Sequence, residues 1–201
     1  MKIFKSNSYD ILMIYLGQIV ISIFALAVYF LVSMIPGYEN LGFINIIASV
    51  FAVGFYCVIV YSSTWQLASA DRIKIDSGRY EYIKTKGLFL GLFANIPNII
   101  VSLLNIFAVS MYLLGCGEFF KGMTAAVSTV QKLHSALYFG FIHGITPKQV
   151  EGAVNYGDIV VESILYLVLP IIVIATIQFA YSMGTRNKRI INKAPKEKKE
   201  K

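Results

Sequence analysis

The sequence predicts an all-α membrane protein: a four-transmembrane-helix bundle with a short cytoplasmic β-hairpin connector and an external amphipathic helix. Of its 201 residues, 57% are hydrophobic and 14% are charged, whereas a soluble domain carries about 25% charge. Four apolar stretches, three of them uncharged and the fourth with one acid, are each long enough to cross a hydrocarbon core of about 30 Å. The basic residues lie in alternate connections, as in multi-pass proteins of the cell membrane.

The first two spans are expected at 11–35 and 41–67, inside a single transmembrane domain of residues 11–183. Small and polar side chains recur there at helical spacing: Gln18, Ser22, Ala25 and Tyr29 in the first span, and Asn45, Ser49, Ala52 and Tyr56 in the second. We expect these faces to pack against other helices, because membrane bundles use small and hydroxyl residues at helix contacts.

The connector between the second and third spans, residues 68–86, holds most of the internal charge. Isoleucines and tyrosines alternate there with charged residues on either side of Ser77-Gly78, which predicts a β-hairpin turning at that pair. In this register Asp71 would face Lys84, while Lys74 would face Glu81 and Asp76 would face Arg79. The connector is either a simple link that carries the topology signal or a partner-docking surface of Asp71, Arg72, Lys74, Arg79, Glu81 and Lys84.

The third span, 87–114, opens with Gly87-x-x-x-Gly91, a spacing that permits close helix approach. Its polar residues share one face and must meet protein or water, because an unsatisfied amide in hydrocarbon costs several kcal/mol. Two interpretations remain open: interhelical hydrogen bonds that hold the bundle together, or a polar cavity near the membrane midplane. The candidate cavity residues are Asn95, Asn98, Ser102, Asn105 and, from the fourth span, Glu162.

The outer segment, 115–157, contains an amphipathic helix. Met123, Val127, Val130 and Leu133 share one face, and Thr124, Ser128, Gln131 and Ser135 share the other. This pattern favours a helix in the membrane interface and leaves a re-entrant position open, while Gln131, Lys132 and His134 in its middle argue against a fifth span. His134 and His143 are nine residues apart, which does not suit a helical metal pair, so we expect no metal site.

The fourth span, 159–183, follows a predicted helix start at Thr146. An acidic stripe of Glu151, Asn155, Asp158 and Glu162 ends just inside it. The stripe is either a solvated face that reaches the headgroups or an entrance that attracts a cation or proton, with Glu162 the deepest member. Pro170 should kink this span. The tail, 184–201, has eight basic residues and two acids. We expect it to contact anionic lipid headgroups, and we expect no nucleic-acid partner.

Basic residues also predict the orientation. The N-terminus 1–10, the connector and the tail hold 2, 5 and 8 Lys and Arg, against none in the first turn and 3 in the outer segment. Both termini and the connector are therefore expected on the cytoplasmic side.

Enzyme signatures are missing from the sequence: it contains no C-x-x-C, H-E-x-x-H, Walker A or G-x-S-x-G motif. We therefore expect no catalytic residues and no cofactor. The leading hypothesis is a non-enzymatic accessory or assembly subunit of a membrane complex, with a protein partner in the membrane. The alternatives are a small-solute transporter or transporter subunit that uses the polar face of the third span, and an intramembrane enzyme.

Several positions carry a resemblance: Trp65, Asp71, Gly78-Arg79, Lys86-Gly87, Gly91, Pro97 and Tyr181-x-x-Gly184. Their arrangement resembles uncharacterised small four-helix integral membrane proteins of Gram-positive bacteria. The resemblance covers the connector, the third span and the end of the fourth. It implies a bacterial cell membrane and no particular activity.

Overall fold

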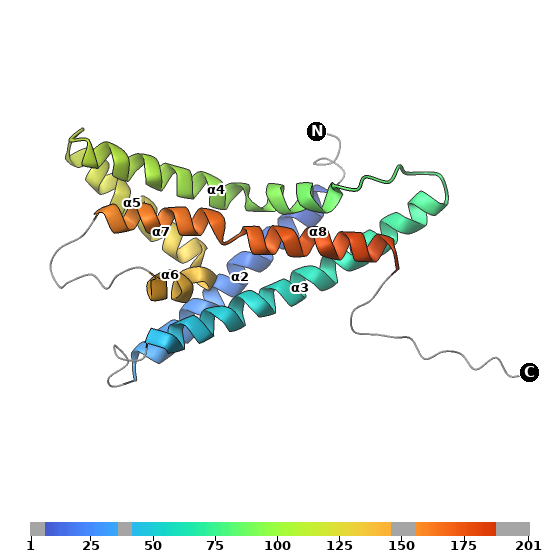
Figure 1. Ribbon diagram of the computed structural model, residues 1–201, viewed down its shortest axis with the longest axis horizontal. Coiled ribbons are helices and arrows are strands. Elements are labelled where there is room, and N and C mark those ends of the chain that lie inside the picture. The colour runs from blue at the N-terminus through green and yellow to red at the C-terminus, as the bar shows by residue number, and fades with distance from the viewer. Residues whose placement is uncertain (1–6, 36–41, 146–155, 188–201) are drawn as a thin grey trace, which may run out of the picture.

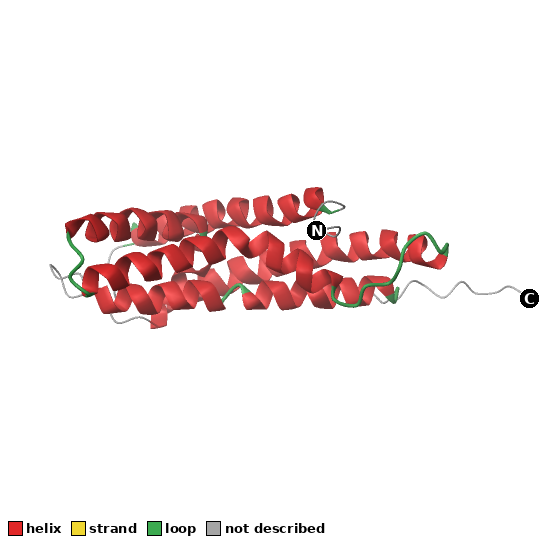
Figure 2. Cartoon of the chain, turned by 90° about the horizontal axis from the view of Figure 1, so that it is seen from above, coloured by secondary structure: helices red, strands yellow, loops and turns green. Residues whose placement is uncertain are grey.

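A computed structural model describes residues 7–35, 42–145 and 156–187, and the regular structure in these ranges is helical (Figures 1 and 2). The elements are α2 (Ser8–Ser33), α3 (Gly42–Asp76), α4 (Lys86–Leu113), α5 (Glu118–His134), η2 (Ala136–Tyr138), α6 (Phe139–Ile145), α7 (Tyr156–Val168) and α8 (Ile171–Thr185). The expectations for Thr146, Glu151, Asn155 and the tail beyond Asn187 fall outside these ranges.

Within the described ranges, four helical segments are long and apolar enough to cross a membrane: α2, α3, α4 and the consecutive helices α7 and α8. By length and composition they confirm the predicted all-α membrane protein. The fourth segment breaks where Pro170 was expected to kink it, because proline has no backbone N–H to continue the helix. Pro170 instead begins α8 as its N-cap residue, with φ −58°.

The predicted β-hairpin is wrong, since α3 continues as a helix to Asp76 and no strand occurs in residues 42–145. Ser77-Gly78 ends that helix: Gly78 has φ +71°, its N–H donates to the Ile75 carbonyl at 2.9 Å, and the Arg79 N–H donates to the Lys74 carbonyl at 2.9 Å. These two bonds form a Schellman cap. Extending a helix already formed costs less than starting a new element, so α3 runs on until a glycine can adopt a positive φ.

The amphipathic segment packs alongside α4 and does not lie across the end of the bundle (Figure 1). Ser135, just after α5, donates a hydrogen bond to Asn98 at 2.9 Å. Asn98 lies fifteen residues before Leu113, the last residue of α4, which corresponds to about 22 Å along the helix axis. The chain then returns through η2 and α6, which packs on α3. Thus α5, η2 and α6 form a helical hairpin that folds back within the bundle.

The two faces of α5 have the arrangement expected for a helix inserted among apolar surroundings. Gln131, on its polar face, is 2% exposed, while Leu133, on its apolar face, is 55% exposed. A helix resting in the interface would instead turn its polar face to water. The polar face of α5 is therefore a packing surface within the bundle.

Side chains from α2 and α3 satisfy the backbone groups at the tip of this hairpin. Ser22 donates to the His134 carbonyl at 2.9 Å, and Ser49 accepts the Gly140 N–H at 2.8 Å. The hydroxyl of Tyr29 also accepts the Gly140 N–H, at 3.2 Å. The helical faces predicted for the first two spans thus contact the hairpin as well as each other.

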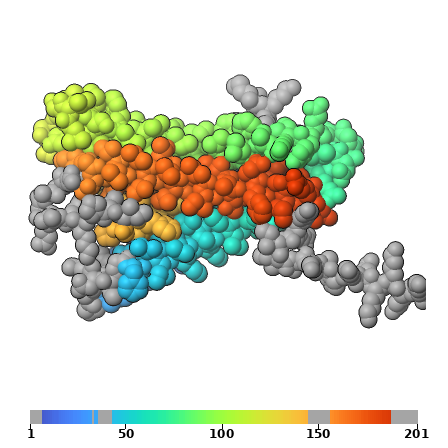
Figure 3. Space-filling view, viewed as in Figure 1, coloured from blue at the N-terminus to red at the C-terminus, as the bar shows by residue number. Residues whose placement is uncertain are grey.

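Close approach of α4 and α8 depends on the predicted glycine pair, and Figure 3 shows the two helices side by side. A Cβ added at Gly87 would lie 2.8 Å from the Cα of Gln178, and one at Gly91 would lie 3.1 Å from the Cα of Ile174. Gln178 accepts the Leu88 N–H at 2.7 Å and donates to the Lys84 carbonyl at 2.9 Å. It therefore satisfies backbone groups at the start of α4.

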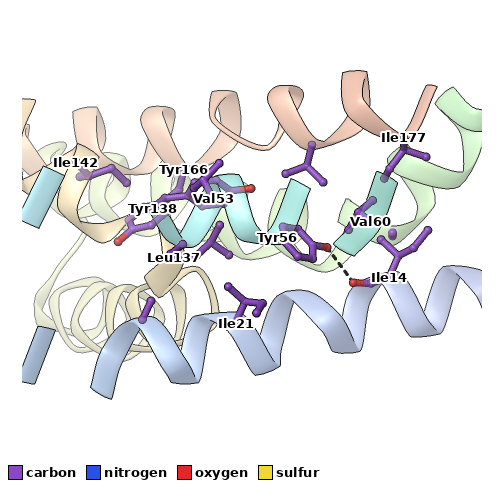
Figure 4. Close-up of a cluster of buried hydrophobic side chains, with 14 of the residues drawn as sticks. Ile14, Ile21, Val53, Tyr56, Val60, Leu137, Tyr138, Ile142, Tyr166 and Ile177 are labelled. Carbon is purple, nitrogen blue, oxygen red and sulfur yellow. Dashed lines mark hydrogen bonds between the residues drawn. The ribbon is translucent and has the colours of Figure 1, made fainter. Parts of the chain in front are cut away.

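Tyrosines and aliphatic residues fill the apolar core between α2, α3, the hairpin and α7 (Figure 4). The hydroxyl of Tyr56 donates to the Ile14 carbonyl at 2.9 Å. The hydroxyls of Tyr138 and Tyr166 are buried without a hydrogen-bond partner among the described residues. An unsatisfied buried polar group costs about 1–3 kcal/mol. The hydroxyls of these two tyrosines therefore do not stabilise the core, and the favourable contribution of both residues comes from burial of their rings.

Substituting Gly140 tests the hairpin. A Cβ at Gly140 would lie 1.8 Å from the Asn45 carbonyl oxygen, whereas one at Gly122, in α5, would meet no atom within 4 Å. We expect Gly140→Ala to destabilise the protein by about 2 kcal/mol or more through overpacking. Gly122→Ala should leave stability equal or slightly higher, because alanine favours a helix. Thermal unfolding in detergent, followed by size-exclusion chromatography, compares the two; equal midpoints would contradict the hairpin.

Candidate functional site

The asparagine face of α4 is buried against α5 and α7. Asn105 donates to the Gln131 side-chain oxygen at 2.6 Å and to the Ser163 hydroxyl at 3.0 Å. Ser128 donates to the Asn105 side-chain oxygen at 3.0 Å. One amide of α4 therefore joins residues from two other helices through its donor and its acceptor.

The remaining residues of this face continue the network toward the hairpin tip. Gln131 donates to the Ser102 hydroxyl at 2.9 Å, and Asn98 accepts from Ser135 at 2.9 Å. Asn98 in turn donates to Asn95 at 3.0 Å, and Asn95 donates to the Gly91 carbonyl at 2.9 Å. All four predicted residues of α4 thus lie together and have hydrogen-bond partners. These contacts favour interhelical hydrogen bonding as the role of the polar face.

Glu162, the fifth candidate, does not join this network. Its carboxylate lies 3.2 Å from the Lys132 ammonium group, and the two side chains are 15% and 41% exposed, respectively. A partly exposed pair of this kind contributes little to stability. The five candidate cavity residues therefore do not form one site. Four belong to the network on α4, and Glu162 belongs to a separate ion pair that joins α7 to α5.

At the opposite end of the bundle, Asp71 forms a buried ion pair with Lys86, the first residue of α4. Their charged atoms are 2.5 Å apart, and the side chains are 4% and 2% exposed. Tyr181 of α8 donates to the same carboxylate oxygen at 3.1 Å. The Lys86 ammonium also lies over the ring of Tyr80 at 5.1 Å. The predicted pairing of Asp71 with Lys84 is wrong, because the helical course of α3 brings Lys86 to this carboxylate instead.

The other connector candidates lie beyond this ion pair, on the last turns of α3 and the loop to α4. Arg72 is half-buried and pairs with Asp76 at 3.3 Å, while Lys74 lies 3.7 Å from Asp71. Both are contacts within one helix, at i,i+4 and i,i+3, and replace the predicted pairing across a hairpin turn. Exposed charges and apolar groups are interspersed here: Lys74, Arg79, Glu81, Lys84, Ile73 and Tyr82. We call these six residues and Arg72 the connector surface.

Among the described residues, no group of three or more His, Cys, Asp and Glu could hold a metal ion. Comparison with protein-family models, with curated proteins and with solved structures finds no match for this chain. The function must therefore be argued from the geometry of the chain itself.

Replacing Asn105 tests the role of the polar network. Asn105→Leu leaves the Gln131 oxygen and the Ser128 hydroxyl without this partner, so we expect a loss of about 1–3 kcal/mol in the free energy of unfolding. The double variant Asn105→Leu/Gln131→Leu should be less destabilised than the sum of its single variants, because both members of the pair become apolar. Equilibrium unfolding of the four proteins in mixed micelles measures this coupling.

Leu103→Ile, on the exposed face of α4, is the control for that experiment and should be close to neutral. If Asn105→Leu instead leaves stability unchanged and abolishes uptake of a solute by cells, the polar face serves transport and not packing.

Proposed function

We propose that this chain is a non-enzymatic subunit or assembly factor of a membrane complex and that it holds a protein partner at the connector surface. The observation that carries this proposal is the buried Asp71–Lys86 ion pair. It anchors the point from which the last turn of α3 and the loop to α4 extend beyond the bundle. Because Lys86 begins α4, the residues beyond Asp71 stand clear of that helix. The helix α3 continues for five further residues, or about 7 Å.

The composition of the connector surface suits a protein partner. It carries both signs of charge, and Ile73 and Tyr82 are 72% and 47% exposed among them. Protein interfaces combine aromatic and aliphatic anchors with arginine and a polar rim. Four residues of the connector surface are basic and one, Glu81, is acidic. Attraction to anionic lipid alone would explain the basic residues, but neither Glu81 nor the exposed apolar groups.

The transporter alternative receives less support from the contacts. A transported solute needs polar groups that are free to bind it, whereas the amides of α4 bind one another and the polar face of α5. The ion pair of Glu162 with Lys132 likewise occupies the acid that would have attracted a cation. These contacts favour a structural role for the interior and direct attention to the ends of the bundle.

We further propose that the connector and both termini lie in the cytoplasm, at a bacterial cell membrane. The distribution of lysine and arginine, 15 against 3, supports this orientation. The arrangement of the helices agrees with it, because the start of α2, the connector and the end of α8 gather at one end of the bundle (Figure 1). The turn between α4 and α5 lies at the other end.

The two native cysteines allow a direct test of this orientation. Cys116 is exposed in the turn after α4, and Cys57 is partly buried within α3. In a Cys57→Ala background, we expect a membrane-impermeant maleimide added to spheroplasts to label Cys116. In a variant without native cysteines, Ser77→Cys should be labelled only after the membrane is opened. The reverse pattern would overturn the orientation.

The partner is tested by reversing charges on the connector surface. We expect the full-length protein, crosslinked gently in its native membrane and purified, to retain a stoichiometric protein partner. The double variant Arg79→Glu/Lys84→Glu should lose most of that partner, because rim charges steer and orient association. Lys121→Glu, a single charge reversal at an exposed position near the start of α5 at the other end, is the control and should retain it. A partner that survives the connector variant, or none in the native protein, would contradict the proposal.

A further inference from the structure

A second feature of the connector end is a cavity of about 300 Å³ between α3 and α8. It is lined by Arg72, Ile75, Asp76, Tyr82, Thr185 and Arg186. At Gly184, one residue before the cavity begins along α8, the two helices pack closely, since a Cβ at Gly184 would lie 2.6 Å from the Trp65 carbonyl oxygen. The cavity opens where α8 ends at Thr185 and α3 continues.

The cavity lies at the level where the membrane spans end. Arg72 follows Asp71, which binds Lys86 at the first position of α4. Thr185 is the last residue of α8, and Arg186 is the next. Three of the four candidate spans therefore begin or end near this cavity, at Asp76, Lys86 and Thr185, which corresponds to the headgroup region of a bilayer that these spans cross.

The lining residues have the chemistry of a phosphate site with an apolar edge. Two arginines and one aspartate line the cavity, and Arg186 has no acid within salt-bridge distance in the described part of the chain. Arg72 is held by Asp76 in an exposed pair that a stronger anion could replace. A guanidinium binds phosphate oxygens in a bidentate manner, with hydrogen bonds strengthened by the charge.

We propose that this cavity binds the phosphate of an anionic phospholipid headgroup. A free phosphate would satisfy the arginines alone, but the apolar side chain of Ile75 and the ring of Tyr82 suit the glycerol and the first carbons of a lipid. The position at the end of the spans also places the cavity where lipid phosphates are concentrated. The cavity would bind one lipid at a defined position, whereas the basic tail attracts the membrane surface without a defined binding site.

Native mass spectrometry of the full-length protein, titrated with phosphatidylglycerol or phosphatidylcholine, tests the proposal. We expect one phosphatidylglycerol to bind more tightly than the next and more tightly than phosphatidylcholine, whose choline cation disfavours a site with two arginines. The double variant Arg72→Gln/Arg186→Gln should weaken this first binding by about tenfold or more, at about 1 kcal/mol for each basic residue. Lys198→Gln/Lys199→Gln, which removes the same charge from the tail, should change it little.

Two further measurements keep the result decisive. Arg186→Gln alone alters a residue beyond the end of α8 for which the described part of the chain provides no ion pair, so the fold should be retained while binding weakens about fivefold. Inorganic phosphate and glycerol 3-phosphate should not displace the lipid; displacement by either would identify free phosphate as the ligand and overturn the lipid assignment. Equal losses in the cavity and tail variants would show that attraction is diffuse and no site exists.

Discussion

The structure depends on one constraint: backbone groups that enter hydrocarbon must find their partners within the chain. A continuous helix meets this requirement by itself, but a helix that stops within the bundle does not. Between α5 and α6 the chain changes direction, and the freed His134 carbonyl and Gly140 N–H are bound by Ser22 and Ser49. The hairpin therefore depends on the hydroxyl groups that α2 and α3 present at its tip.

The same constraint shapes the charged end of the bundle. Removing either Asp71 or Lys86 would leave the other charge buried and unpaired, which costs about 3–5 kcal/mol in a typical buried pair. The pair is close and is completed by the Tyr181 hydroxyl, so the ends of α3 and α8 and the start of α4 are held together. The connector surface can consequently project from the bundle without support from its own residues.

The sequence alone was sufficient for the features that depend on local spacing: the four apolar spans, the break at Pro170, the glycine pair at the start of α4 and the polar faces. The sequence led to a wrong prediction, the β-hairpin, where one local pattern is compatible with two structures. Ser77-Gly78 suits both a two-residue hairpin loop and a helix cap, and the choice depends on whether a helix already extends to that point. The partners Ser163, Lys86 and Tyr181 could not be predicted, because only the packing of distant helices brings them to the site.

One further signal was present but could be interpreted only with the fold. The polar residues of α4 at 98, 102 and 105 meet residues 135, 131 and 128, which lie in or just after α5, in reverse order and at matching intervals. Such a match indicates two antiparallel helices that bind each other, whereas a ligand cavity would leave one row without a complement. Because the interior polar groups bind one another, we expect the surface that binds a partner or ligand to lie at the connector end. There, Arg72 and Tyr82 belong both to the connector surface and to the proposed lipid cavity, so a partner that covers them would compete with the lipid for the same guanidinium group.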